Sequence, residues 1–315
     1  MDKTIKIILA SLWILIALIL TVFLVRGIQG NLPSFSRGFN VKDLWEESGE
    51  TLLEGDSVGN NVEAVSIGEK FSSLDIELIN EKLIVEVWEE NYTEIIIDSS
   101  FDDSKRPKVY VNGDTVEIKT PKRNNAKLRN FNDSVIVKLS KSVAENLFDL
   151  DVDIVSGSIN ISDIQVTKAS LSTVSGSIHL DNSNLLKLSA DSVSGSLKTN
   201  NCKIEEISAE SVSGSINFVA DVSKSFELGS VSGSIRLETN TMPILGGDCE
   251  SMSGSIKIFL PENDGFKLDY ESISGSVSNE FTSSKLKKSG ENVYKNGNIE
   301  FDVESVSGSI SFSKI

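Results

Sequence analysis

Residues 155–159 read Val-Ser-Gly-Ser-Ile, and this pentapeptide or a close variant of it occurs eight times between Val155 and Ile310. Successive copies lie 19 residues apart four times, 21 apart twice, and 33 apart before the last copy. A fixed period of this length is typical of proteins in which short structural repeats stack on one another. The central glycines of the eight copies are Gly157, Gly176, Gly195, Gly214, Gly233, Gly254, Gly275 and Gly308.

The residues inside one copy indicate a β-strand. Val193, Gly195 and Leu197 alternate with Ser194 and Ser196. Alternation with a period of two, together with β-branched residues, predicts a half-buried strand. Its apolar residues would face the interior and its serines would face solvent. The stretches between copies contain apolar residues and turn formers, and they predict a second strand with flanking turns in each repeat.

The equal spacing predicts that strands of successive copies pair in parallel, about 4.8 Å apart. Parallel ladders normally need helical crossovers, and no long helical pattern lies between the copies. A chain that coils avoids this need. The sequence therefore predicts an all-β fold, a parallel β-solenoid with about 19–21 residues per coil, over residues 151–315. Eight coils would give a rod segment on the order of 40 Å long at this spacing.

The glycine in each copy is in phase with the residues expected to face inward. We expect it to let opposing walls of the coil approach closely, or to permit a bend. The flanking serines are expected to form outward ladders that hydrogen-bond between coils. The alternative is that these serine ladders form a flat binding surface.

The N-terminal segment is apolar enough to cross a membrane. Residues 5–25 contain few polar residues and are long enough for the hydrocarbon core, which predicts a transmembrane signal anchor after a short cytoplasmic N-terminus, residues 1–4. A cleaved signal peptide is the alternative, but no small-x-small cleavage site follows. The numbers of lysine and arginine residues before and after this segment are nearly equal, so the positive-inside rule decides little about its orientation. The short basic N-terminus favours a single-pass protein of the cell membrane, with its C-terminal domain outside the cytoplasm.

Two regions separate this segment from the repeats. Residues 26–60 are rich in glycine and are expected to be a flexible stalk. Residues 61–150 contain strand patterns without the pentapeptide. They are either a β-rich cap or degenerate early coils, because a solenoid needs protected ends.

The long interval before the last copy predicts an inserted loop at residues 279–298 that projects from the rod. Insertions in solenoids often lie on a binding face. Lys285, Lys287 and Lys288 in this loop are therefore candidate partner-binding residues. The alternative is a solvated basic loop with no partner.

The charge of the chain narrows the classes of partner. The 315 residues carry a formal net charge of −16. This acid excess disfavours nucleic acid, whose phosphates would be repelled, and adsorption on anionic lipid. Two cysteines and one histidine exclude a disulfide framework and a zinc site of the usual Cys/His type. We therefore expect neither a metal nor a cofactor.

The sequence offers no catalytic constellation. His179 is in phase with the outward serines, and no Ser/His/Asp set can be built around it. Carbohydrate-cleaving enzymes need paired carboxylates, which on a β-helix would have to lie on adjacent coils. The acids at Asp163, Asp181, Glu205 and Asp221 shift phase from coil to coil, which predicts that no acid column forms. We therefore expect no catalytic residues and no enzymatic activity.

Four segments carry a resemblance to a known family. They are Asp153–Ile159, Ile258–Phe266, which reads Ile-Phe-Leu-Pro-Glu-Asn-Asp-Gly-Phe, Glu271–Val277 and Glu304–Ile310. Over roughly residues 62–315 the chain resembles the DUF4097-type putative adhesins of bacteria, relatives of LiaF-like and auto-transporter-adhesin-like head domains. The resemblance implies a β-solenoid outside the cytoplasmic membrane, often behind an N-terminal anchor. It supplies no catalytic residues.

Three functions are compatible with these features. The favoured one is a non-enzymatic, membrane-anchored interaction module that binds a protein or a surface polymer through the solenoid face or the inserted loop, as an adhesin or as an accessory protein in envelope-stress signalling. The second is a structural scaffold that self-associates through the ends of the solenoid. The third is a β-helix carbohydrate-active enzyme.

Overall fold

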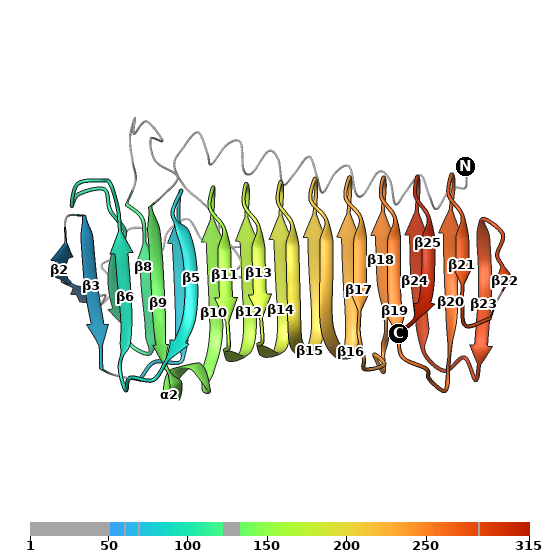
Figure 1. Ribbon diagram of the computed structural model, residues 1–315, viewed down its shortest axis with the longest axis horizontal. Helices are drawn as coiled ribbons and strands as arrows, with labels where there is room; N and C mark the ends of the chain where they lie inside the picture. The colour runs from blue at the N-terminus through green and yellow to red at the C-terminus, as the bar shows by residue number, and fades with distance from the viewer. Residues whose placement is uncertain (1–50, 60, 69, 122–132, 283) are drawn as a thin grey trace.

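The computed structural model describes residues 51–315 apart from 60, 69, 122–132 and 283 (Figure 1). The described chain is all-β, with strands β1 to β25 and one short helix, α2 (Lys141–Ala144). The expected signal anchor and the stalk up to residue 50 lie outside the described residues. Within the described ranges, no helix is long and apolar enough to cross a membrane.

The chain coils so that each turn adds one strand to each of two sheet faces, with the core between them (Figure 1). In their order along the rod, the strands of face A are β8 (Thr115–Lys119), β4 (Ser73–Leu78), β10 (Leu147–Ile154), β12 (Gln165–Thr173), β14 (Asn184–Ser192), the later parts of β15 (Leu197–Ser211) and β16 (Ile216–Ser230), β18 (Gly246–Ser251), β24 (Glu300–Ser305) and β20 (Gly265–Ser272). Those of face B are β9 (Ser134–Ser140), β5 (Lys82–Trp88), β11 (Ile159–Ser162), β13 (Ile178–Asp181), the first parts of β15 and β16, β17 (Ile235–Glu238), β19 (Ile256–Leu260), β25 (Ile310–Lys314) and β21 (Val277–Asn279).

Successive coils pair in parallel and in register, as the repeat predicts. On face A, Ala169, Leu188, Ile207 and Phe226 lie side by side on neighbouring strands, and all four are buried. Every second side chain of a strand points into the core. Burial of each large apolar side chain contributes about 1.5–3 kcal/mol, so the register is fixed by which residues reach the core.

The Val-Ser-Gly-Ser residues form a corner between the two faces. Face A strand β14 ends at Ser192, and face B resumes at Leu197. Ser192 is buried, whereas Val193 is only half-buried. The expectation that the valine faces inward is therefore wrong, because the chain turns here and the alternation is interrupted, whereas Ser194 is exposed as expected. In the next coil, Gly214 N donates a hydrogen bond to Oγ of the buried Ser211, at 2.9 Å.

The glycines of the eight corners stack directly on one another. A Cβ placed on Gly195 would lie 1.7 Å from the carbonyl oxygen of Gly176, and one on Gly214 would lie 1.7 Å from that of Gly195. Only glycine therefore fits where successive coils approach this closely. The expectation that the glycine serves opposing walls of one coil is wrong, because the close neighbour is the next coil along the rod.

The last coil in the sequence is not the last coil of the rod. Strand β24 lies between β18 and β20, and β25 lies between β19 and β21 (Figure 1). Gly308 accordingly stacks between Gly254 and Gly275. The 33-residue interval thus contains the return of the chain into a gap one coil wide, which spacing along the sequence cannot reveal.

The insertion at residues 279–298 does not project from the rod. It contains β22 (Ser284–Lys285), which pairs with β21, and β23 (Ser289–Lys295), which pairs with β20 in antiparallel fashion. These strands cover the C-terminal edges of the two faces. The expected projecting loop is therefore a cap, and a covered edge is less available for pairing with another chain.

The N-terminal end follows the same plan. The coil of β4 and β5 lies between the coil of β8 and β9 and the coil of β10 and β11. Beyond it, antiparallel strands complete the end of the rod (Figure 1). Residues 61–150 thus supply both coils and cap. The additional strands are β1 (Thr51–Leu53) and β7 (Lys108–Asn112) on face A, and β2 (Asp56–Gly59), β3 (Val62–Ile67) and β6 (Thr93–Asp98) on face B. The expectation of a flexible stalk is wrong for β1 and β2, because both strands pair with the cap.

Candidate interaction surface

Two columns of carboxylates run along the outer side of face A, because the strands hold equivalent positions in register. The first acid column contains Asp75, Asp151, Glu227, Asp248, Asp302 and Asp269, and the second contains Glu77, Asp153, Asp191, Glu210, Glu250, Glu304 and Glu271. The other positions of both columns, between β4 and β20, hold serine or glycine.

The prediction that no acid column forms is therefore wrong. It rested on acids such as Asp163 and Asp181, which belong to the corner opposite the glycines. The columns are built from acids at other positions of the repeat. An aspartate or glutamate stands four residues before the central glycine in six of the eight copies, as Asp191 does before Gly195. That recurrence was visible in the sequence and is the signal that identifies the second column.

The acids gather in two clusters along the columns. The first is on β4 and β10, where burial raises the pKa of Asp153 to about 8, with further contributions from Asp151 and Glu77. Burial likewise raises the pKa of Asp75 to about 7. At the edge of this cluster the Lys119 ammonium is hydrogen-bonded to Glu117.

The second cluster lies on β18, β24 and β20. Burial raises the pKa of Glu304 to about 7, and the neighbouring charges of Asp302 and Glu250 raise it further. The pKa values of Glu250 and Asp302 are raised for the same reasons. Lys267, two residues before Asp269 on β20, forms ion pairs with Glu291 and Glu300 at 3.4 and 2.8 Å. Neighbouring carboxylates on parallel strands thus repel one another along this face.

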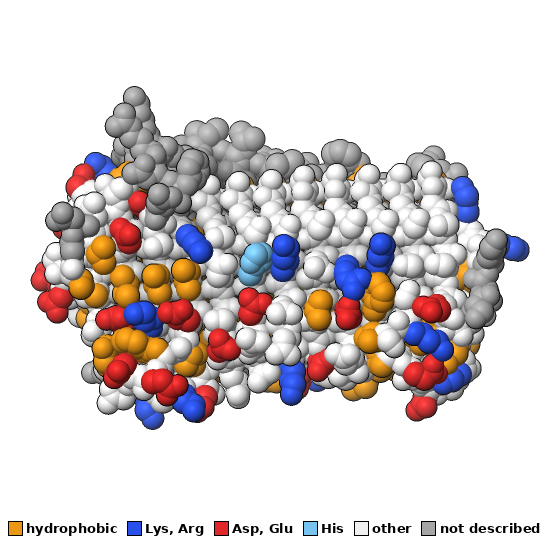
Figure 2. Space-filling model, in the orientation of Figure 1, with side chains coloured by type: hydrophobic (Ala, Val, Ile, Leu, Met, Phe, Trp, Pro, Cys, Tyr) orange, Lys and Arg blue, Asp and Glu red, His pale blue; other side chains and the backbone are white. Residues whose placement is uncertain are grey.

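Face B carries the opposite sign of charge in one of its columns. His179, Lys198, Arg236 and Lys257 occupy one register column, interrupted by Asn217. Figure 2 shows this face, on which the single histidine is pale blue and the adjoining corner residues form a smooth white edge. His179 thus lies on the surface of the rod, where the sequence placed it.

The three lysines predicted to bind a partner lie at the C-terminal end of the rod, beside the glycine corner of Gly275. Lys285 is in β22, and Lys287 and Lys288 follow in the connection to β23. Lys287 and Lys288 are exposed, and Lys288 Nζ donates a hydrogen bond to the carbonyl oxygen of Ile273 at 2.8 Å. Their role as binding residues stays a prediction.

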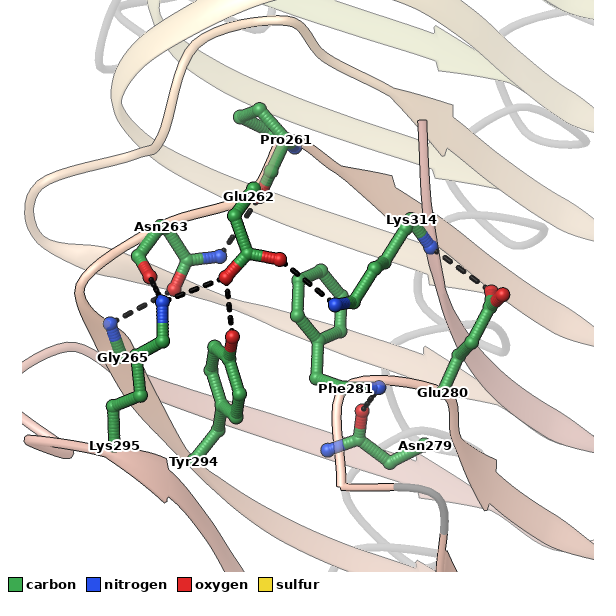
Figure 3. A network of polar contacts seen from close by, with 10 residues as sticks. All are labelled: Pro261, Glu262, Asn263, Gly265, Asn279, Glu280, Phe281, Tyr294, Lys295 and Lys314. Atoms are coloured by element: carbon green, nitrogen blue, oxygen red, sulfur yellow. Dashed lines mark hydrogen bonds and ion pairs between the residues drawn. The ribbon is translucent and has the colours of Figure 1, made fainter.

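A polar network that the sequence did not single out fastens the end of the chain (Figure 3). The Glu262 carboxylate accepts hydrogen bonds from Lys295 Nζ at 2.6 Å, from Lys314 Nζ at 2.8 Å and from the Tyr294 hydroxyl. These bonds, from Lys295 first, hold the pKa of Glu262 well below its usual range. The backbone N–H of Lys314 also donates to Glu280 at 3.1 Å.

An open groove of about 860 Å³ follows the start of the face A strands, from β10 towards β16. Its wall includes the apolar side chains of Phe148 and Leu186, which are 60% and 47% exposed. The carboxylates in it are Glu145, Glu205 and Asp221. The groove is therefore separate from the two acid columns.

A family model described as Toastrack DUF4097 matches residues 72–313 of the chain. The chain belongs to this family. Among curated proteins, none matches this Toastrack chain. The match confirms the resemblance expected from the repeats, and it covers the coils and the C-terminal cap but not the strands β1, β2 and β3 of the N-terminal cap.

Solved structures similar to the Toastrack chain are distant in sequence. A putative adhesin from Bacteroides fragilis is 14% identical, with a TM-score of 0.49, and the match covers 82% of this chain and 98% of that one. A putative adhesin from Parabacteroides merdae is 12% identical, with a TM-score of 0.44 and coverage of 81% and 97%. A putative lipid binding protein from Parabacteroides distasonis is 16% identical, with a TM-score of 0.44 and coverage of 82% and 98%.

The described part of this Toastrack chain shows no group of three or more His, Cys, Asp or Glu side chains placed to hold a metal ion. Cys202 and Cys249 are buried free thiols, and burial raises the pKa of both. The acid columns lie on the outer side of a sheet, and their carboxylates repeat at the spacing of the strands. This arrangement suits contact with an extended, positively charged partner.

Proposed function

We propose that this Toastrack protein is a non-enzymatic interaction module, anchored in the cell membrane by residues 5–25 with the β-rod outside the cytoplasm. Its acidic face A would bind the cationic groups of a protein segment or a surface polymer. The observation that carries the proposal is the alignment of carboxylates on successive strands, which gathers negative charge on one face. The apolar length of residues 5–25 supports the anchor.

The physical reason for a cationic partner is the repulsion within the columns. Two like charges 4 Å apart interact with about 1 kcal/mol in water and about four times more near a protein surface. Carboxylates on neighbouring strands, about 4.8 Å apart, face each other at a similar distance. A row of ammonium or guanidinium groups would relieve this repulsion. Because all of these carboxylates except the buried Asp153 are exposed or half-buried, such binding weakens as salt is added.

The first test uses an oligolysine peptide and the full-length protein in detergent. Replacing four acids of the second cluster, in the variant D248N/E250Q/D302N/E304Q, is expected to weaken binding by about tenfold or more, since exposed ion pairs contribute about 0.2–1 kcal/mol each. The matched control E54Q/D56N/E89Q/E90Q makes the same change in net charge at exposed acids of the N-terminal end. It should retain the affinity of the unaltered protein. Equal losses in both variants would show that net charge alone governs binding and would contradict the proposal.

The second test concerns the anchor and its orientation. In intact cells, protease added outside is expected to digest the β-rod while the first residues of the chain stay protected. A protein without residues 1–28 should appear in the soluble fraction. Full protection of the rod in intact cells, with digestion after lysis, would place it in the cytoplasm and overturn the orientation.

A further inference from the structure

The C-terminal coil fills a slot within the rod, and both sides of the slot are strand edges. Strand β24 pairs with β18 on one side and β20 on the other, while β25 pairs with β19 and β21. If this coil left, four strand edges would lose their partners. Unpaired edges of this kind are ready to accept another strand.

The coil that fills the slot must also bury large apolar side chains. Phe301 of β24 and Phe312 of β25 are almost completely buried. Phe301 stacks against Phe226 with ring centroids 5.7 Å apart, and both Phe301 and Phe312 pack against Phe266, at 5.5 and 5.7 Å. An occupant of the slot must therefore supply two large aromatic side chains, and it must supply a glycine where Gly308 stacks.

The connection of this coil to the rest of the chain permits it to move as a unit. Ile315, the last described residue of this coil, is exposed. On its other side, residues 296–299 join it to β23. Lys295, the last residue of β23, and Gly297 in this short connection have positive φ angles of 48° and 65°. One exposed ion pair, from Lys314 to Glu262, holds the end of β25 in place.

We propose that the slot is a binding site for the C-terminal coil of a second copy of this chain, so that two copies exchange residues 300–315. The second copy is the occupant because its coil supplies the same aromatic side chains, the same glycine and the same lysine for Glu262. Exchange restores every contact and alters only the connection at residues 296–299, which is the condition for domain swapping. This inference goes beyond the proposed function and does not depend on face A binding a partner.

The test places the two halves of a disulfide on different chains. Asp302 lies on β24, in the coil that fills the slot, and its register partner Asp269 lies on β20, which borders the slot. Both are exposed, and residues paired in this way on neighbouring strands are close enough for a disulfide. Full-length D269C and full-length D302C are unfolded together, refolded in detergent and oxidised. If coils exchange, a covalent dimer of the two variants forms, because the C-terminal coil of the D302C chain enters the slot of the D269C chain. The control pair is S189C with S208C, register partners of the same column on internal coils, and it should form no dimer above background.

A second measurement keeps the test decisive. The variant with both D269C and D302C in one chain should form the disulfide within a monomer, which shows that the coil is folded in its slot. The change Glu262→Gln, which removes the ion pair with Lys314 of the exchanged coil, is expected to increase the yield of mixed dimer at least twofold. If the single-chain disulfide forms but the mixed pair gives no more dimer than the control pair, the proposal is overturned.

Discussion

The central glycine of each repeat is the residue on which the spacing of the coils depends. At Gly214 the nearest atom to an added Cβ is the backbone carbonyl oxygen of Gly195 in the preceding coil. The backbone beside it is fixed by the hydrogen bond that Ser213 N donates to Val193 O at 3.0 Å. An alanine would force the coils apart at the corner. The consequence reaches beyond one residue, because the corners of neighbouring coils share the same stack.

The change Gly214→Ala is therefore expected to destabilise the protein by about 1–3 kcal/mol or more, as an overpacked core position does. Gly229 on face A is the matched control, since its added Cβ would meet only a side-chain carbon of Glu210 at 3.6 Å. Gly229→Ala should be neutral or slightly stabilising, because alanine lowers the entropy of the unfolded chain. Urea unfolding measures the free energy of unfolding of both variants. Equal unfolding midpoints for the two variants would disprove the role of the glycine stack.

At the scale of the element, face A ties stability to pH. The pKa values of Asp153, Asp75, Asp191 and Glu304 in the folded protein are raised to about 7 or 8, above the values of about 4 that unfolded chains have. Between pH values of about 4 and about 8, the folded state therefore binds more protons than the unfolded state. Stability therefore falls as pH rises through this window.

The thermal midpoint is thus expected to be higher at pH 5 than at pH 8.5. The variant Asp153→Asn should reduce the difference, because the amide does not ionise. Lys224→Ala is a control on the same rod, since it removes a surface ammonium that pairs with Glu205 and leaves the raised carboxyls in place. A midpoint that rises steadily with pH would contradict the account of repelling carboxylates.

The elements also show where reasoning from the sequence was sufficient and where it was not. The 19-residue period predicted parallel strands in register, and side chains such as Leu188 and Ile207 confirm it. The corner was misjudged because Val193 continues the alternation of apolar and polar residues although the backbone turns there. The acid columns were missed because acids at the wrong position of the repeat were compared.

For the whole molecule, chain order concealed the arrangement of the ends. The repeats predict eight coils, but the coils of β4 with β5 and of β8 with β9 lack the pentapeptide. The spacing also contains no information about which edge each coil joins. Phe301 and Phe312 mark the last coil as one with a large aromatic core, yet only the three-dimensional neighbours Phe226 and Phe266 explain why. The lysines at 285–288 were chosen for a projecting loop, and the structure places them in a cap instead.

The first and the last coil of the chain each lie between two other coils near an end of the rod. The contacts that build the two ends therefore do not involve the middle of the rod. Neither cap contacts the coils of β12, β14 and β15, which repeat one pattern. Gain or loss of one 19-residue repeat in this middle part would change the rod by one strand spacing, about 4.8 Å, and leave both ends intact. The two acid clusters lie on either side of this stretch. Duplication of a single repeat would therefore lengthen the distance between the two acid clusters by one strand spacing without altering either cluster.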